Sequence, residues 1–255
     1  MRISLLILFI TANYYGISQT NISGIINIYT PVISIDYCSQ TITVSNPGGF
    51  SIGDKVLLIQ MKGATIDLNN SPSFGSILNY NNAGNFEFGI IKTINGNKIT
   101  FINEILRAYN TNDKVQLVRV PVYNIAVVKG LLTCQNWNGS TGGILVFECT
   151  GDLYLNAYID ASGKGFSGGQ FQNVGSSCYY YANYFASNAL DGALKGEGIA
   201  NIGSPYLRAR GAIANGGGGG SNHNGSGAGG ANGGYGGHGG DYMWQDGGIG
   251  GYILD

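Results

Sequence analysis

Residues 216–220 read Gly-Gly-Gly-Gly-Gly, and the chain continues with Gly-Gly-Tyr-Gly-Gly-His-Gly-Gly-Asp at 233–241 and Gly-Gly-Ile-Gly-Gly-Tyr at 247–252. Glycine fills 20 of the 41 positions from 211 to 251. The triplets match a helix of three residues per turn, in which positions without a side chain let extended left-handed helices pack backbone to backbone. We therefore predict a bundle of the polyglycine II type in a glycine-rich segment, residues 211–255.

Two alternatives to this bundle remain open. A flexible tail is the first, because glycine loses the most backbone freedom on ordering and the segment has few bulky apolar groups to bury. A set of β-arches is the second. Order is favoured by aromatic side chains that can cover such a bundle, namely Tyr179, Tyr180, Tyr181, Tyr235, Tyr242, Trp244 and Tyr252.

The N-terminus has the pattern of an export signal. Arg2 precedes an apolar run at residues 3–10, and small residues stand at the −3 and −1 positions of a cut after Ser18. We predict residues 1–18 as a cleaved signal peptide. No later stretch approaches the ~20 apolar residues that cross a bilayer. The protein is therefore expected to be secreted or held at the cell surface, with no membrane span after cleavage.

Charge and histidine content exclude several classes of function. Charged residues make up 11% of the chain, against about 25% in an average protein. The formal net charge is −1 and neither sign forms a block, so we expect no nucleic-acid partner. Only two histidines, His223 and His238, are available for acid–base or metal chemistry. We predict no catalytic site, no cofactor and no metal site.

Residues 19–134 have a β pattern throughout and are predicted as a small β-sandwich or barrel module. Short Val, Ile, Thr and Phe runs are separated by Asn-Gly and Asn-Pro-Gly-Gly turn signals. Residues 86–90 alternate as a half-buried strand does, and residues 95–97 (Asn-Gly-Asn) predict a hairpin turn. Two segments, 53–61 and 112–120, share an Asp-Lys-Val entry and are expected to be paired strands of one module.

Residues 135–210 are predicted as a β-solenoid-like segment, because shorter strands alternate with small residues that suit the corners of stacked rungs. A plain β-sandwich is the alternative for this part. Residues 183–195 are the only place where a short helix is expected. The fold class is therefore all-β, with a compact module, a solenoid-like layer and a glycine-rich end.

Four cysteines in an exported chain predict disulfides. Spacing favours Cys134 with Cys149, because they flank a turn-rich segment and antiparallel strands beside it would bring the two sulfur atoms together. Cys38 with Cys178 follows by elimination. A zinc site made of the four thiolates is the alternative.

Two weaker motifs suggest other functions. Residues 236–244 fit the glycine- and aspartate-containing nonapeptide of calcium-binding rolls, with Asp241 as the candidate ligand. Asp152 and Asp160 flank a predicted rung and are candidate acids of a carbohydrate-active enzyme. Stacking on sugar rings is a third possibility, with five candidate aromatic residues: Tyr179, Tyr180, Tyr181, Tyr235 and Trp244.

Several stretches, in this order, resemble the N-terminal region of large secreted surface proteins of gliding Bacteroidetes. They are residues 53–64 (Gly-Asp-Lys-Val-Leu-Leu-Ile-Gln-Met-Lys-Gly-Ala), 115–123 (Val-Gln-Leu-Val-Arg-Val-Pro-Val-Tyr), 137–143, 159–166 and 209–220. The resemblance implies an adhesin-like protein exported by type IX secretion. Such proteins often end in a sorting domain. None is recognisable here, so the chain is expected to be a fragment. The glycine tract alone also resembles, in composition, the glycine-rich domain of the anaplastic lymphoma kinase receptor family.

These observations predict a structural or adhesive surface protein without catalytic activity, which presents a glycine-rich element for binding or as a scaffold. Cell-surface glycans or other surface proteins are the expected partners. A glycan-binding module or carbohydrate-active enzyme on a solenoid is one alternative function. A calcium-binding glycine-rich roll is the other.

Overall fold

The computed structural model describes residues 19–173, 183–221, 224–241 and 247–254. The predicted signal peptide lies outside this described part of the chain. The all-β prediction is confirmed: thirteen strands and two three-residue 3₁₀ turns, η1 (Thr111–Asp113) and η2 (Ala189–Asp191), are the elements assigned there. The short helix expected within 183–195 is the single turn η2. No helix in the described part is long and apolar enough to cross a bilayer.

Six antiparallel strands close into a barrel in the order β2-β3-β8-β7-β4-β9. Closure pairs every strand on both sides and leaves no open edge. β4 and β9 pair directly, as their shared Asp-Lys-Val entry predicts, and β7 and β8 form the expected hairpin. The strands are β2 (Tyr29–Asp36), β3 (Thr41–Val44), β4 (Lys55–Gln60), β7 (Phe86–Asn95), β8 (Lys98–Phe101) and β9 (Val115–Val120).

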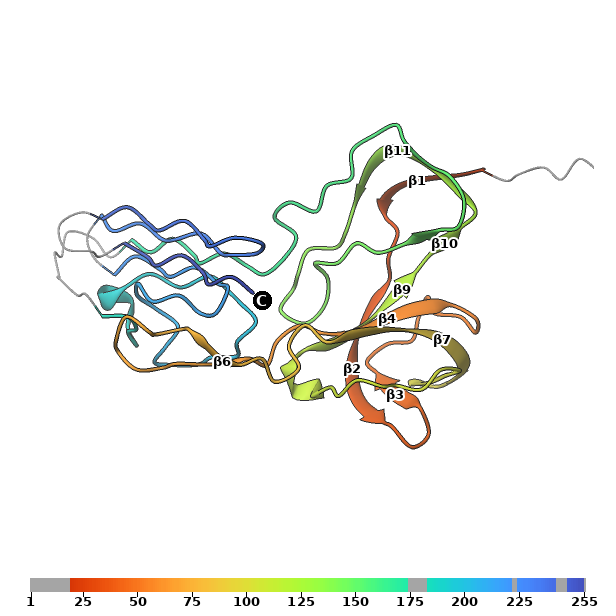
Figure 1. The fold of residues 1–255 in the computed structure, drawn as a ribbon, viewed down its shortest axis with the longest axis horizontal. Coiled ribbons are helices and arrows are strands. Elements are labelled where there is room, and N and C mark those ends of the chain that lie inside the picture. Colours follow the sequence, from red (N-terminus) through yellow and green to blue (C-terminus); the bar gives the residue numbers. More distant parts are fainter. Residues whose placement is uncertain (1–18, 174–182, 222–223, 242–246, 255) are drawn as a thin grey trace, which may run out of the picture.

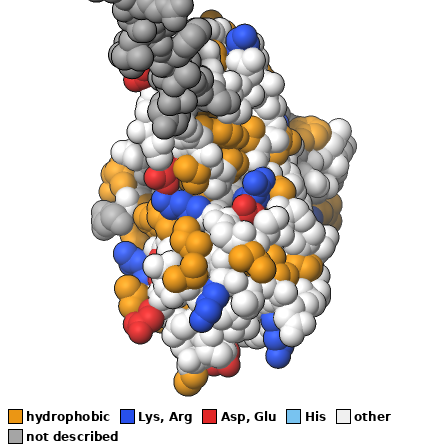
Figure 2. Space-filling view, turned by 90° about the vertical axis from the view of Figure 1, so that its right-hand side faces the viewer, with side chains coloured by type: hydrophobic (Ala, Val, Ile, Leu, Met, Phe, Trp, Pro, Cys, Tyr) orange, Lys and Arg blue, Asp and Glu red, His pale blue; other side chains and the backbone are white. Residues whose placement is uncertain are grey.

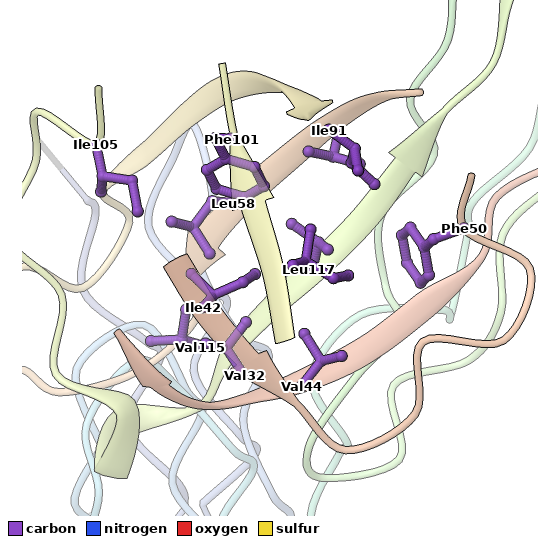
Figure 3. Packing of buried hydrophobic residues seen from close by; sticks show 12 residues of the cluster. Val32, Ile42, Val44, Phe50, Leu58, Ile91, Phe101, Ile105, Val115 and Leu117 are labelled. Carbon is purple, nitrogen blue, oxygen red and sulfur yellow. The ribbon is translucent and has the colours of Figure 1, made fainter. Parts of the chain in front are cut away.

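The barrel interior is filled with branched apolar side chains and two phenylalanines (Figure 3). Ile42, Ile91, Ile99 and Leu117 have no exposed surface. Each such buried side chain contributes roughly 1.5–3 kcal/mol relative to an exposed one. The full set is Val32, Ile42, Val44, Phe50, Val56, Leu58, Ile91, Ile99, Phe101, Ile105, Val115 and Leu117.

A second region is a stack of parallel strands above the barrel (Figure 1). β1 (Gln19–Ile25), β11 (Ile125–Thr133) and β13 (Leu153–Leu155) form one sheet in that order. β10 (Val122–Tyr123) pairs with β12 (Glu148–Cys149), also in parallel. The layer of β11 and the layer of β13 keep a constant offset in residue number. Ala126 lies opposite Leu153, and Leu132 lies opposite Ile159.

The third region contains the glycine-rich sequence. Extended segments lie side by side there, at the opposite end of the molecule from the parallel stack (Figure 1). We call these segments the glycine bundle. Its six members are residues 192–198, 207–214, 216–221, 225–231, 234–241 and 247–252.

The bundle is attached to the barrel by the long connection between β4 and β7. This connection carries β5 (Thr65–Ile66) and β6 (Ile77–Asn79), and it runs along the bundle. Ala64 bridges to Ala200 in parallel, and the amide of Gly63 donates to the carbonyl of Ile199 at 2.8 Å. A small apolar cluster with Ile66, Ile199 and Ile213 at its centre seals the contact.

The surface has few charges. On the face at the right-hand end of Figure 1, charged side chains of both signs are scattered among polar and hydrophobic ones, some of them side by side (Figure 2). This distribution matches the low charge content of the sequence.

Candidate binding site on the glycine bundle

Hydrogen bonds of the segment 247–252 repeat every three residues. The amides of Gly248 and Gly251 donate to the carbonyl oxygens of Ser226 and Gly229, at 2.8 and 3.0 Å. Both acceptors belong to the same neighbouring segment. Residues three apart in the sequence therefore face the same neighbour, which is the spacing of the glycine triplets.

The residues that directly follow these two glycines face other neighbours. Ile249 and Tyr252 donate to Arg210 and Ala214, at 2.7 and 2.8 Å, while the carbonyl of Ile249 accepts from Gly218 at 2.8 Å. A strand in a sheet bonds only to two neighbours, which lie in one plane. This segment bonds to more than two neighbours, so the assembly is a bundle and not a sheet.

Glycine is required where backbones meet. A Cβ atom built on Gly218 would lie 1.9 Å from the carbonyl oxygen of Arg210, and one on Gly250 would lie 1.8 Å from that of Gly236. Neither distance is possible without moving the backbone. Gly237, in contrast, has nothing within 4 Å of its Cβ position. Glycines inside the bundle are therefore a packing requirement, whereas some at its surface are not.

A groove of about 600 Å³ runs across one face of the bundle. Its floor is the backbone of residues 218–220 and 225–228, and residues 169–173 form a wall. Phe171 and Leu190, which line the groove, are 88% and 53% exposed. The floor holds its shape because the segments beneath it are bonded to one another.

The groove is polar but uncharged: none of its described lining residues is ionisable. Amide side chains come from Gln170, Gln172 and Asn224, and the Gln172 side-chain oxygen accepts from Arg208 at 3.2 Å. Amides together with an exposed phenyl ring can bind a neutral, hydroxyl-rich molecule by hydrogen bonds and ring stacking.

Glu197 fastens the bundle to the other two regions. Its carboxylate accepts from the Lys62 ammonium at 2.9 Å, from the Trp137 indole N–H at 3.0 Å and from the Ser167 amide at 3.0 Å. The ring of Phe166 packs edge-on against Trp137 and lies beneath the Lys62 ammonium. Burial alone would raise the pKa of Glu197, but the Ser167 amide and Lys62 together hold that pKa below its ordinary value.

Lys195 is a second residue that connects the bundle to the rest of the molecule. The residue is 7% exposed, and its side-chain nitrogen Nζ donates to the carbonyls of Tyr184 and Gly211. The same nitrogen lies 4.2 Å from the centre of the Phe74 ring, on the connection from the barrel. Burial lowers the pKa of Lys195 to about 6.

Comparison with known proteins finds only distant likeness. No family model matches the chain. No curated protein matches it either. Among solved structures, the gp54 tailspike of Acinetobacter baumannii bacteriophage AP22, solved with A. baumannii capsular saccharide, is 17% identical with a TM-score of 0.26. That match covers 52% of this chain and 24% of the tailspike.

A second match has the same level of similarity. The tailspike gp49 of Pseudomonas phage LKA1 is 17% identical with a TM-score of 0.26, over 42% of this chain and 17% of that one. The chain thus spans about a quarter or less of the tailspikes that it matches.

The predicted stacking aromatics are only partly visible. Tyr235 is 75% exposed on the segment 234–241, away from the groove lining. Tyr179, Tyr180, Tyr181 and Trp244 lie outside the described residues. The sequence analysis did not predict a role for Phe171. The signal available was its position between Gln170 and Gln172, because amide groups beside an aromatic ring are a combination that can bind sugars.

The candidate acids lie at turns. Asp160 accepts from the amide of Ser162 at 2.7 Å, and Ser162 lowers the pKa of this carboxyl group. The Asp152 carboxylate accepts from the Tyr154 hydroxyl at 3.2 Å. Asp241 accepts from the amide of Gly247 at 2.7 Å and so links the segments 234–241 and 247–252. Among the described residues, no group of three His, Cys, Asp or Glu side chains could hold a metal ion.

The predicted disulfide between Cys134 and Cys149 is not formed, and both thiols are free. The prediction assumed antiparallel strands around residues 136–143. The strands are instead stacked in parallel, which places Cys149 opposite Tyr123, at the other end of the layer from Cys134. Cys38 is also free and exposed, while Cys178 lies outside the described residues.

Proposed function

We propose that this protein is a non-catalytic surface adhesin whose glycine bundle is a rigid display element of the polyglycine II type. The observation that carries the proposal is the three-residue repeat of hydrogen bonds, combined with glycines that leave no room for a Cβ atom. Hydrogen bonds to several neighbouring segments hold each backbone in place against the large conformational entropy of glycine, and so stiffen the bundle. The solenoid-like parallel stack and the barrel then serve as its base.

The groove on the bundle is the proposed ligand site, and a neutral glycan is the ligand class that its chemistry favours. The lining combines amide groups, backbone and the exposed ring of Phe171 without an ionisable side chain. Sugar hydroxyls satisfy amides by hydrogen bonding, and the apolar face of a sugar ring stacks on an aromatic ring. A strongly acidic polymer would find no cationic side chain among the described residues that line this groove.

The test is glycan binding by the purified protein with a matched pair of glycine variants. Gly227 lines the groove, and its Cβ position is 3.6 Å from the nearest atom, so the backbone accepts a side chain there and Gly227→Leu should occupy the groove. Gly237→Leu makes the same chemical change outside the groove. We expect at least tenfold weaker binding on a glycan array for Gly227→Leu only. Equal binding by both variants would exclude the groove.

Stiffness is tested separately by amide hydrogen exchange. The described amides of residues 211–251 should exchange slowly in the intact protein, because many are bonded to neighbouring backbone. Exchange at the rate of an unfolded chain throughout this range would contradict the display element, whatever the glycan array reports.

Export is also part of the proposal, in line with the resemblance to secreted surface proteins of gliding Bacteroidetes. A cut after Ser18 would leave β1 whole, because this strand begins at Gln19. N-terminal sequencing of the protein from the culture medium or cell surface should begin at Gln19. An uncut chain retained in the cytoplasm would contradict this proposal.

A further inference from the structure

The parallel stack ends in an uncovered apolar layer. Ile22, Val128 and Leu155 lie in one column across β1, β11 and β13. Their exposed fractions are 4%, 0% and 62%. The column is therefore buried in β1 and β11 and exposed to solvent in β13.

A second column repeats the pattern. Leu132 is fully buried, whereas Ile159, which lies opposite it in the next layer, is 43% exposed. Tyr154 and Tyr158 in the same layer are 48% and 85% exposed. Stacked β layers normally end in a polar cap, because an apolar final layer invites pairing. This final layer has no such cap among the described residues.

The two edges of this sheet complement each other. β1 and β13 are its outer strands, and no other described strand pairs with their outer sides. Since all three strands are parallel, the outer side of β13 presents the hydrogen-bonding groups that the outer side of β1 requires. A translated second copy can therefore continue the stack without reversing any strand.

We propose that the chain self-associates head to tail, with β1 of a second copy stacked in parallel on β13. The sheet register then places Ile22 of the second copy beside Leu155, and Asn21 of the second copy beside Tyr154. Leu155 becomes the middle of a continuous apolar column. The contact is heterologous, so it leaves one free edge at each end and can extend to longer assemblies.

Sedimentation velocity over a concentration series of the purified protein tests this contact. We expect the average mass to rise with concentration for the wild type. Leu155→Lys should weaken association at least tenfold, because a charge without a partner would be buried against Ile22. Leu155→Met, which keeps volume and polarity, should associate as the wild type does. Ile52→Lys is the control, since Ile52 is 68% exposed on the barrel.

The register is tested by a charge pair. Tyr154→Lys in one copy and Asn21→Glu in another put opposite charges side by side only in the proposed arrangement. A mixture of these two variants should associate more tightly than either variant alone. A wild type that stays monomeric up to about 100 µM would overturn the proposal. So would equal effects of Leu155→Lys and Ile52→Lys in proteins shown to be folded by circular dichroism.

Discussion

The Lys62 ammonium lies 2.9 Å from the carboxylate of Glu197, although 135 residues separate them in the chain. Lys62 lies just beyond the end of the barrel strand β4, after Met61, whereas Glu197 belongs to the glycine bundle. Trp137, on the connection between β11 and β12, donates to the same carboxylate. One carboxylate thus contacts residues from all three regions, so we expect the position of the glycine bundle to depend on it.

Removing this charge should loosen the molecule. Glu197→Gln keeps the shape of the side chain but leaves the Lys62 ammonium, whose side chain is 10% exposed, without its counter-ion. We expect a loss of roughly 1–2 kcal/mol in the free energy of unfolding at pH 7, measured by urea denaturation. Glu148→Gln breaks the more exposed pair with Lys55 and should cost less than about 1 kcal/mol. Equal losses would contradict the role given to Glu197.

The same pair predicts an acid dependence. The pKa of Glu197 is lowered in the folded protein, so its contribution is complete above the unfolded value of about 4.3 and is lost as the pH falls through the folded value. The wild type should therefore lose stability below about pH 5 more steeply than Glu197→Gln. Parallel acid limbs in the two stability curves would refute this.

Lys195 predicts a second rise in stability with pH, at higher pH than that of Glu197. Its folded pKa of about 6 lies below the unfolded value of about 10.4, so the unfolded chain binds more protons between these values. The free energy of unfolding should rise from pH 6 to 9, and Lys195→Met should flatten that rise. Lys129→Met, at an exposed position of β11, should leave it intact. Identical slopes for the wild type and Lys195→Met would argue against a neutral buried amine.

Two glycine variants test whether glycine is required for close backbone packing or is only a feature of the composition of this segment. Gly250→Ala should destabilise the protein by at least about 2 kcal/mol, because its Cβ atom would lie 1.8 Å from the Gly236 carbonyl oxygen. Gly237→Ala should be neutral or stabilise by up to about 1 kcal/mol, since its Cβ atom has open space. Thermal melts of the two variants measure the difference. A flexible tail would tolerate both changes equally.

Thiol labelling tests the cysteine assignments. Cys38 is exposed and should react quickly with a maleimide in the folded protein, whereas buried Cys134 should react only on unfolding. Burial also raises the pKa of the Cys134 thiol, which slows its reaction further. Mass spectrometry of a non-reduced digest gives the result. A peptide pair linked through Cys134 and Cys149 would contradict the parallel stacking of that region.

The barrel illustrates how far local patterns reach. The Asn95-Gly96-Asn97 turn and the shared Asp-Lys-Val entries predicted the β7–β8 hairpin and the β4–β9 pair. The alternation of residues 86–90 predicted a strand as well. Its larger side chains face outward, however: Phe86 and Phe88 are 48% and 46% exposed. Period-two alternation identifies two faces but not which of them is covered, because the covering strands come from elsewhere in the chain.

In the candidate site, too, some features follow from the local sequence and others depend on tertiary contacts. The triplet spacing of glycine predicted the three-residue hydrogen-bond repeat, since that repeat is a property of neighbouring residues. The amides beside Phe171 suggest a polar surface, but nothing local indicated that this ring would line a groove with residues 218–221 and 224–228, or that the Lys195 side chain would be buried against Phe74. Both depend on contacts between segments far apart in the sequence.

The sequence by itself determined the all-β character, the hairpin turn and the positions where backbone can approach backbone, because each follows from the dihedral preferences and side-chain size of a few adjacent residues. Only the tertiary structure decided that Cys134 and Cys149 stay apart, that Glu197 meets Lys62 and that Leu155 ends an uncovered column. These outcomes depend on the direction in which strands stack. That direction is chosen by the burial of surface contributed by the whole chain and not by any single stretch of it.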